Sequence, residues 1–296
     1  MAVPRLPILA SFLLITSPFV RADDPEKRLV TGEPGAGEPV QMNVPNAAKA
    51  GESPARDEGF LHLLEILETL DAPVFTRNSL QFKYEWTELA GGAALGVVTF
   101  KPVFVFGGKR ELALRIEAPV LTRYSNDPAT PTVSGFGSIT TTLVWAFYAR
   151  EGIHQSIGLE LQWNTATNSA VGAPWIVEPV YTVVFRFSPW LALSVEVNWQ
   201  KSFASLGGYN PVDLVQLKPT LSFALPAWFF LSAQENTSWN LETREVGLFL
   251  KVTAGRFLSV GRDVALSVEY ETPLNPAAGQ AMTMMVGAIL SYYYGW

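Results

Sequence analysis

From Leu80 onward, apolar and polar residues alternate along the chain with a period of two. In the first run, apolar residues at even positions 80–86 are separated by polar residues at odd positions 81–87. The same alternation recurs at 112–117, 157–164, 191–200, 215–223 and 264–271. A period of two predicts β-strands that have one apolar and one polar face.

Counting every such run predicts about twelve strands. The predicted ranges are 80–90, 94–106, 109–120, 137–149, 154–165, 175–187, 190–202, 212–225, 227–237, 244–254, 263–271 and 281–295. An even number of antiparallel strands is typical of bacterial outer-membrane barrels.

The connections between these strands alternate in length. Longer polar connections are expected at 122–136, 166–174, 203–211, 238–243 and 272–280, and tight turns at 107–108, 149–153, 188–189 and 226. Long external loops and short periplasmic turns are the outer-membrane arrangement. The expected turn at 255–262 is longer than this rule predicts.

The strands of a soluble barrel also alternate apolar and polar residues, but their apolar face points into the barrel. Composition favours the membrane: 48% of the 296 residues are hydrophobic, 16% are charged and the mean hydropathy is +0.18. After the N-terminus no apolar run is long enough for a spanning helix. Aromatic residues near strand ends suit interfacial girdles, namely Trp86, Trp163, Trp175, Trp190, Trp199, Trp228 and Tyr292 to Tyr294. We therefore predict a transmembrane antiparallel up-and-down β-barrel over residues 79–296.

The residues before the barrel divide into three segments, 1–22, 23–57 and 58–78. Residues 1–22 have a positive Arg5, an apolar run and a small-residue cleavage site at Ala22, which predicts a signal peptide, with a signal anchor as the alternative. Residues 23–57 are rich in Gly, Pro, Ala and Glu and predict a disordered periplasmic segment.

Residues 58–78 are expected to hold a short amphipathic helix and a linker. Within 58–71 the apolar residues Phe60, Leu63, Leu64, Leu67 and Leu70 recur at helical spacing. Three placements fit the sequence: inside the barrel lumen, across its periplasmic mouth, or on the membrane surface. His62 is expected to be an exposed helix residue.

Three sequence patterns resemble the outer-membrane proteins described as meta-pathway phenol-degradation or transporter proteins. Residues 135–138 (GFGS) are similar to a G-x-G-D pattern, and Thr165-Ala166-Thr167 with Gly172, Trp175 and Pro179 is similar to a P-T-A-T…G-x-W…P pattern. Leu225-Pro226 with Trp228 and Phe229 completes the match, which covers residues 78–294. Ser138 and Asn164 depart from the family pattern. The resemblance implies a barrel with solute passage rather than a particular substrate. Among the expected small solutes are hydrophobic or aromatic compounds.

Catalytic and cofactor motifs are absent from the sequence. There is no cysteine, only two histidines, and no phosphate loop, zinc spacing or nucleophile elbow, so we predict no metal, no cofactor and no enzyme. His154 and Ser156 with Asn168 resemble an outer-membrane phospholipase arrangement, but their strand parity points them away from lipid. The net charge of -6 without a basic cluster argues against nucleic acid.

The charged residues on the polar strand face are the candidate pore lining. They are Lys83, Glu85, Lys101, Arg115, Glu117, Glu160, Glu178, Arg186, Glu196, Lys218, Lys251, Glu269 and Glu271. Thirteen ionisable groups of both signs suit a wet or salt-bridged interior. They could line a pore of mixed selectivity or form a network that fills a closed barrel.

Function is accordingly expected to be passage of small solutes through the bacterial outer membrane. The alternatives are a non-conducting scaffold or surface-interaction barrel and, less favoured, a lipid-modifying enzyme. Expected partners are outer-membrane lipid, the barrel-assembly machinery and a small solute. Tyr292, Tyr294 and Trp296 lie on one alternating face and resemble the terminal assembly signal of outer-membrane barrels, so the last strand is expected to pair with the first near Leu80.

Overall fold

The computed structural model describes residues 77–107, 111–125, 132–150, 152–168, 172–204, 211–258, 262–279 and 282–294. The expected signal peptide, the disordered segment, the 58–71 helix and Trp296 lie outside the described residues.

Thirteen antiparallel strands in the described residues form one continuous sheet. Their bounds are β1 Asn78–Leu89, β2 Ala94–Phe106, β3 Leu112–Ser125, β4 Val133–Gly135, β5 Thr140–Arg150, β6 Ile153–Gln162, β7 Trp175–Ser188, β8 Leu191–Ala204, β9 Asp213–Ala224, β10 Phe229–Asn240, β11 Val246–Phe257, β12 Val264–Pro273 and β13 Met282–Tyr294. Two short helical turns, η2 (Pro226–Trp228) and α2 (Pro276–Gly279), lie in connections. Among the described residues no helix is long and apolar enough to cross a membrane.

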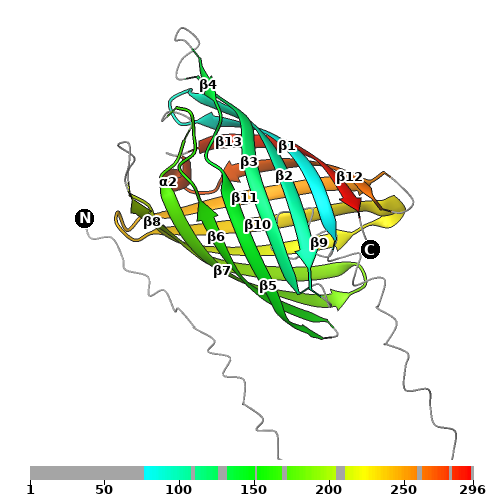
Figure 1. The fold of residues 1–296 in the computed structure, drawn as a ribbon. Coiled ribbons are helices and arrows are strands. Elements are labelled where there is room, and N and C mark those ends of the chain that lie inside the picture. Colours follow the sequence, from blue (N-terminus) through cyan, green and yellow to red (C-terminus); the bar gives the residue numbers. More distant parts are fainter. Residues whose placement is uncertain are drawn as a thin grey trace, which may run out of the picture. The chain divides into compact units, whose positions relative to one another are not determined.

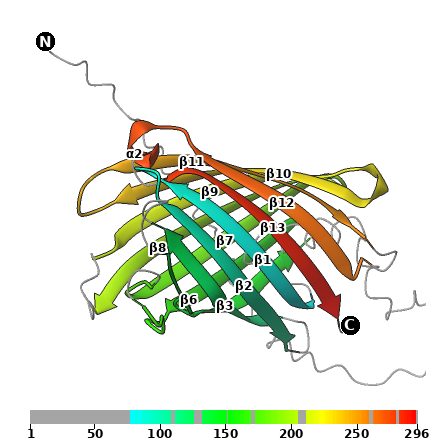
Figure 2. The same cartoon turned by 90° about the horizontal axis from the view of Figure 1, so that it is seen from above.

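The sheet closes on itself. Each strand pairs with the next along the chain, except that β4 pairs only with β3 and β3 pairs directly with β5. β13 pairs with β1 from Tyr294 opposite Asn78 onward. Figures 1 and 2 show β1 and β13 side by side in the wall. Because the three-residue β4 only extends β3, the closed ring consists of twelve strands. The predicted closed antiparallel barrel is confirmed, including the pairing of Leu80 with Tyr292.

We name the two ends of the barrel by the strands that start there. The terminal rim is the end at which β1 begins and β13 ends, and the loop rim is the opposite end. From the predicted loop lengths we expect the terminal rim to face the periplasm.

The predicted strand positions agree with the structure, but several ends were wrong. Residues 122–125, expected in a loop, extend β3, and residues 122–124 pair with β4. The expected turn at 255–262 is wrong for residues 255–257, because β11 continues to Phe257. Gly255 belongs to the strand: a Cβ there would lie 2.2 Å from the ring of Phe230, so the glycine makes room for that ring.

Candidate pore lining

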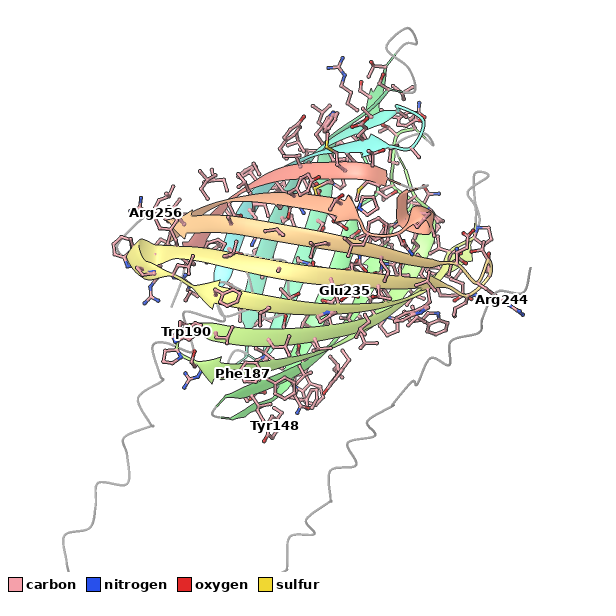
Figure 3. The ribbon with its side chains drawn as sticks, turned by 180° about the vertical axis from the view of Figure 1, so that it is seen from behind. Tyr148, Phe187, Trp190, Glu235, Arg244 and Arg256 are labelled. Carbon is pink, nitrogen blue, oxygen red and sulfur yellow. The ribbon has the colours of Figure 1, made fainter. Side chains whose placement is uncertain are left out.

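The two faces of the barrel wall differ sharply in polarity. In β1, Gln81 is 2% exposed and its neighbour Phe82 is 53% exposed. In β12, Glu269 is 2% exposed and its neighbour Val268 is 57% exposed. At these positions the polar side chains therefore point inward and the large apolar side chains outward, and outward side chains are visible around the wall in Figure 3. This polarity is the reverse of a soluble barrel and suits a wall surrounded by lipid.

Aromatic side chains gather near both rims, as the sequence predicted. Near the loop rim, Trp163 and Trp175 make an edge contact with ring centroids 5.3 Å apart, and Trp175 lies 6.0 Å from Phe203. Phe187 and Trp190 lie at the terminal rim (Figure 3). Tyr293 was wrongly grouped with this girdle, because it points inward and is only 1% exposed.

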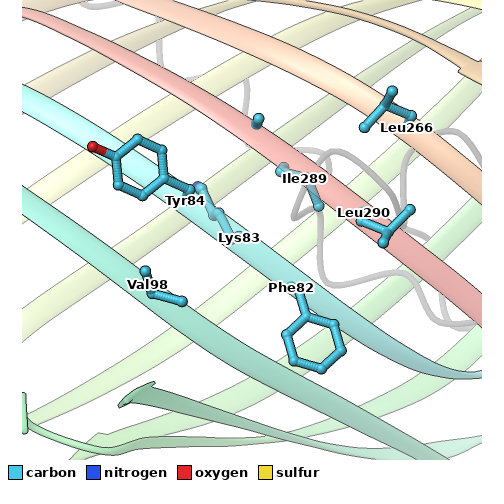
Figure 4. Close-up of a pocket in the computed structure, with 8 residues that line it drawn as sticks. Phe82, Lys83, Tyr84, Val98, Leu266, Ile289 and Leu290 are labelled. Atoms are coloured by element: carbon cyan, nitrogen blue, oxygen red, sulfur yellow. The ribbon is translucent and has the colours of Figure 1, made fainter. Parts of the chain in front are cut away.

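A shallow groove of about 170 Å³ follows the outer wall over β13. Phe82 and Tyr84 of β1 and Leu266 and Leu290 border it (Figure 4). The groove forms because the small Ala288 lies between these larger side chains. Apolar side chains border the groove, so it is not a candidate binding site for a polar solute.

All thirteen predicted pore-lining residues occupy the inward phase of their strands. Most lie near the middle of a strand, whereas Arg186 lies two residues from the end of β7 at the terminal rim. The structure brings twelve of them into three groups around the ring and leaves Arg186 apart from these groups.

The first group bridges β11, β12 and β1. Glu269 lies between two lysines, with its carboxylate oxygens 2.8 Å from Nζ of Lys83 and 2.9 Å from Nζ of Lys251. Lys83 also lies 3.0 Å from Glu85. Glu271 lies two residues along β12 from Glu269 on the same face. Two lysines and three glutamates therefore share this part of the wall.

Gly287 of β13 makes the first group possible. It lies opposite both Glu85 and Glu269 in the strand register, so it separates β1 from β12. A Cβ at Gly287 would lie 2.5 Å from Oε1 and 2.7 Å from Cγ of Glu269. Glu269 can reach Lys83 across β13 because this glycine has no side chain.

The second group connects β2, β3 and β6. Arg115 donates to Glu160 Oε2 at 3.0 Å and lies 3.0 Å from Glu117, which also lies 3.3 Å from Lys101. Thr142 of β5 adds a hydroxyl donor to Glu160 at 2.8 Å. Two bases and two acids thus form a continuous chain across four strands.

The third group lies on β7, β8 and β9. Lys218 lies 2.9 Å from Glu196, and the side-chain amide of Asn198 donates to the same carboxylate at 3.1 Å. Glu178, 7% exposed, is directly opposite Glu160 in the register of β6 and β7. The third group therefore holds two acids and one base, and like charges in directly opposed positions repel.

In the ion pairs between β1 and β6, the basic side chains are less exposed than the acidic ones. The side chains of Lys83, Lys101 and Arg115 are 8%, 3% and 10% exposed, whereas those of Glu85, Glu117 and Glu160 are 27%, 26% and 21% exposed. The bases therefore lie against the wall and the acids face the accessible lumen. On this half of the ring the accessible charge is negative, although acids and bases nearly balance in number.

Two of the three family-like motifs, residues 135–138 and 165–179, meet at the loop rim, whereas the third, around Pro226, lies at the terminal rim. Ser138 Oγ accepts from Ala173 N at 2.9 Å, and the hydroxyls of Thr165 and Thr167 accept from the backbone N–H groups of Ile139 and Phe136. These bonds stabilise the kinked segment between β4 and β5, which regular strand pairing does not hold. The motifs therefore shape the wall and carry no acid-base chemistry.

The structure does not assemble the considered phospholipase arrangement. His154 lies at the start of β6 near the terminal rim, and Asn168 follows the end of the same strand at the loop rim. A ten-residue strand separates them by about 30 Å. Ser156 points inward and is 1% exposed, as strand parity predicted.

Within the described ranges no group of three or more His, Cys, Asp or Glu residues could hold a metal ion.

Sequence reasoning missed Glu235, which lies midway along β10 on the outward face (Figure 3). It is exposed and accepts a hydrogen bond from Thr237 at 2.9 Å. Glu235 has the same parity in β10 as the outward-facing Leu231, so the alternation in the sequence could have placed it on the outward face. Gly287 gave no comparable signal, because its importance depends on residues from two other strands.

Comparison with known proteins supports the fold. No family model matches the sequence, and no curated protein matches it. Among solved structures, the COG4313 outer membrane channel from Pseudomonas putida F1 superposes with a TM-score of 0.57 at 11% identity, covering 73% of this chain and 94% of that chain. KdgM porin superposes with a TM-score of 0.50 at 7% identity, covering 73% of this chain and 99% of that chain. The fold is that of outer-membrane channel barrels.

Proposed function

We propose that this protein is an outer-membrane channel for small solutes, delivered by its signal peptide and inserted by the barrel-assembly machinery. The observation that carries the proposal is the inverted polarity of the closed barrel. An apolar wall surrounds an interior whose charged belt, at Glu85, Glu117 and Glu160, is accessible to water. A soluble carrier protein has the opposite arrangement, with apolar residues inside the barrel and charged residues outside.

The solute class we propose is small compounds, including hydrophobic or aromatic ones. The support is the resemblance of residues 135–138 and 165–179 to the phenol-degradation transporter family. The COG4313 channel is consistent with it as a barrel of the same fold. A non-conducting scaffold is the alternative class, since ion pairs of the same kind can also fill a closed barrel.

Solute flux through proteoliposomes tests the proposal. Vesicles that contain the folded chain should swell in iso-osmotic small sugars or small aromatic acids, and vesicles with the heat-denatured chain should not. Equal swelling of the two preparations in every solute would favour the scaffold.

A further inference from the structure

A row of polar side chains crosses the inner wall from β3 to β8. In the strand register Arg115 of β3 is opposite Thr142 of β5, and Thr142 is opposite Glu160 of β6. Glu160 is opposite Glu178 of β7, and the side chain of Gln200 on β8 hydrogen-bonds Glu178. Neighbouring strands therefore bring these side chains into one continuous row that faces the lumen.

The two acids of this row differ in their partners. Glu160 accepts hydrogen bonds from Arg115 at 3.0 Å and from Thr142 at 2.8 Å. Glu178 is 7% exposed, and no lysine or arginine of the described residues forms an ion pair with it. The amide of Gln200 is a neutral donor and brings no charge. A buried carboxylate without a partner of opposite charge is destabilising, so Glu178 calls for a cation.

The bases on both sides of Glu178 are already paired with other acids. Arg115 contacts Glu117 and Glu160, and Lys218 on β9 lies 2.9 Å from Glu196. The second and third groups together hold four acids and three bases. One negative charge, that of Glu178, is therefore left over in this part of the wall.

Hydrogen-bond acceptors also outnumber donors beside Glu178. Asn198, 2% exposed, donates from its side-chain amide to Glu196 at 3.1 Å, but its own Oδ1 accepts no hydrogen bond from any described residue. It is opposite Val180 in the register of β7 and β8 and so lies diagonally from Glu178 on the same inward face. Because buried polar atoms are nearly always hydrogen-bonded, a ligand here should supply donors as well as positive charge.

The row is accessible from the lumen on both sides of Glu178. The side chain of Glu160 is 21% exposed, and Gln200 is partly exposed. A bare metal ion does not suit the site, because no three acids of the described residues could hold one. An organic cation suits it better, since several N–H groups on one planar or tetrahedral centre can reach separate oxygens.

We propose that Glu178, together with Glu160 and Oδ1 of Asn198, binds a monovalent organic cation with N–H donors, and that the channel selects small ammonium and guanidinium compounds. The selection rests on the proposed channel function, whereas the binding does not. The charge of the solute compensates Glu178, and its N–H groups donate to oxygens that lack donors. An anion of similar size is repelled by the accessible acids of the lumen.

Saturation-transfer NMR on the folded full chain in a non-ionic detergent tests the binding. The probes are methylguanidinium, tetramethylammonium, which has the same charge but no N–H group, and acetate. Methylguanidinium should bind at least about tenfold more tightly than tetramethylammonium, because only methylguanidinium forms charge-assisted hydrogen bonds. Acetate should give no signal. Equal affinities of the two cations, or a stronger acetate signal, would overturn the proposed site.

Two variants locate the site. Glu178→Gln keeps the shape of the side chain and should weaken methylguanidinium binding at least about tenfold. The matched control Glu235→Gln removes a carboxylate from the outward face and should leave binding unchanged. Asn198→Leu removes the amide oxygen and should also weaken binding, which provides the test if Glu178→Gln does not fold. Unchanged binding in Glu178→Gln, or in Asn198→Leu where that variant is the one that folds, overturns the proposal.

Current recording separates the binding site from the channel function. In a methylguanidinium chloride gradient the reversal potential should show cation preference, and Glu178→Gln should reduce that preference. Binding of methylguanidinium without any current removes the channel function and leaves the site. Current steps in a protein that binds no methylguanidinium remove the site and leave the channel.

Discussion

Gly287→Ala should destabilise the barrel by disrupting its most buried ion pair. Glu269 has a side-chain exposure of 1% and is held by Lys83 and Lys251 at 2.8 and 2.9 Å. The added methyl group would lie 2.5 Å from Oε1 and 2.7 Å from Cγ of Glu269, so the carboxylate must move.

The expected loss of unfolding free energy is about 2–4 kcal/mol. Overpacking alone costs about 1–3 kcal/mol, and loss of one partner from a buried pair costs about 3–5 kcal/mol. The expected loss of unfolding free energy is smaller than the sum of these two costs because the Glu269 carboxylate is displaced rather than removed. Lys83, 8% exposed, would keep Glu85 as a partner, which also limits the loss.

Urea unfolding in lipid vesicles, followed by heat-modifiable migration, measures this free energy. Gly96→Ala is the matched control, because its added Cβ points outward and meets nothing closer than 3.8 Å. It should change stability by less than about 0.5 kcal/mol. In a Glu269→Ala background Gly287→Ala should cost almost nothing, since the clash is gone. Equal stabilities of Gly287→Ala and Gly96→Ala would refute the account of this glycine.

Four further perturbations test other parts of the structure. Val197→Arg places a charge mid-strand on the outward face and should cost about 2–4 kcal/mol in vesicle unfolding, whereas Val197→Leu should cost little. Glu235→Leu removes an outward carboxylate and should raise the unfolding free energy by about 1 kcal/mol, and a fall in stability would contradict its exposure to lipid. Glu117→Gln, if the barrel conducts, should shift the reversal potential in a salt gradient toward weaker cation preference, and an unchanged value removes Glu117 from the pore. Deletion of residues 294–296 should lower the amount of folded barrel in outer-membrane fractions, and normal amounts would show that Trp296 is not an assembly signal.

The period-two pattern was enough to predict the strands and the direction of nearly every side chain. Every strand except the short β4, which lies within an expected loop, falls where alternation placed it because one face of each must be apolar throughout. Strand ends were less predictable. Gly255 and Arg256 look like turn residues in sequence, but the ring of Phe230 requires a glycine inside the strand.

The partners within the lumen could not be predicted. Alternation indicates that Glu269 and Lys83 point inward, but their contact depends on the register of both strands against β13 and on Gly287 between them. The sequence also predicted mixed selectivity from nearly balanced charges. Exposure, which sequence does not give, shows that bases such as Lys101 lie against the wall while acids such as Glu117 face the lumen.

Current recording in planar lipid bilayers tests the proposed channel most directly. The folded full chain in a potassium chloride gradient should give discrete current steps with a reversal potential of cation preference. Heat-denatured chain should give no steps. A barrel that is folded by heat-modifiable migration yet gives no current steps would contradict the channel and leave a non-conducting scaffold.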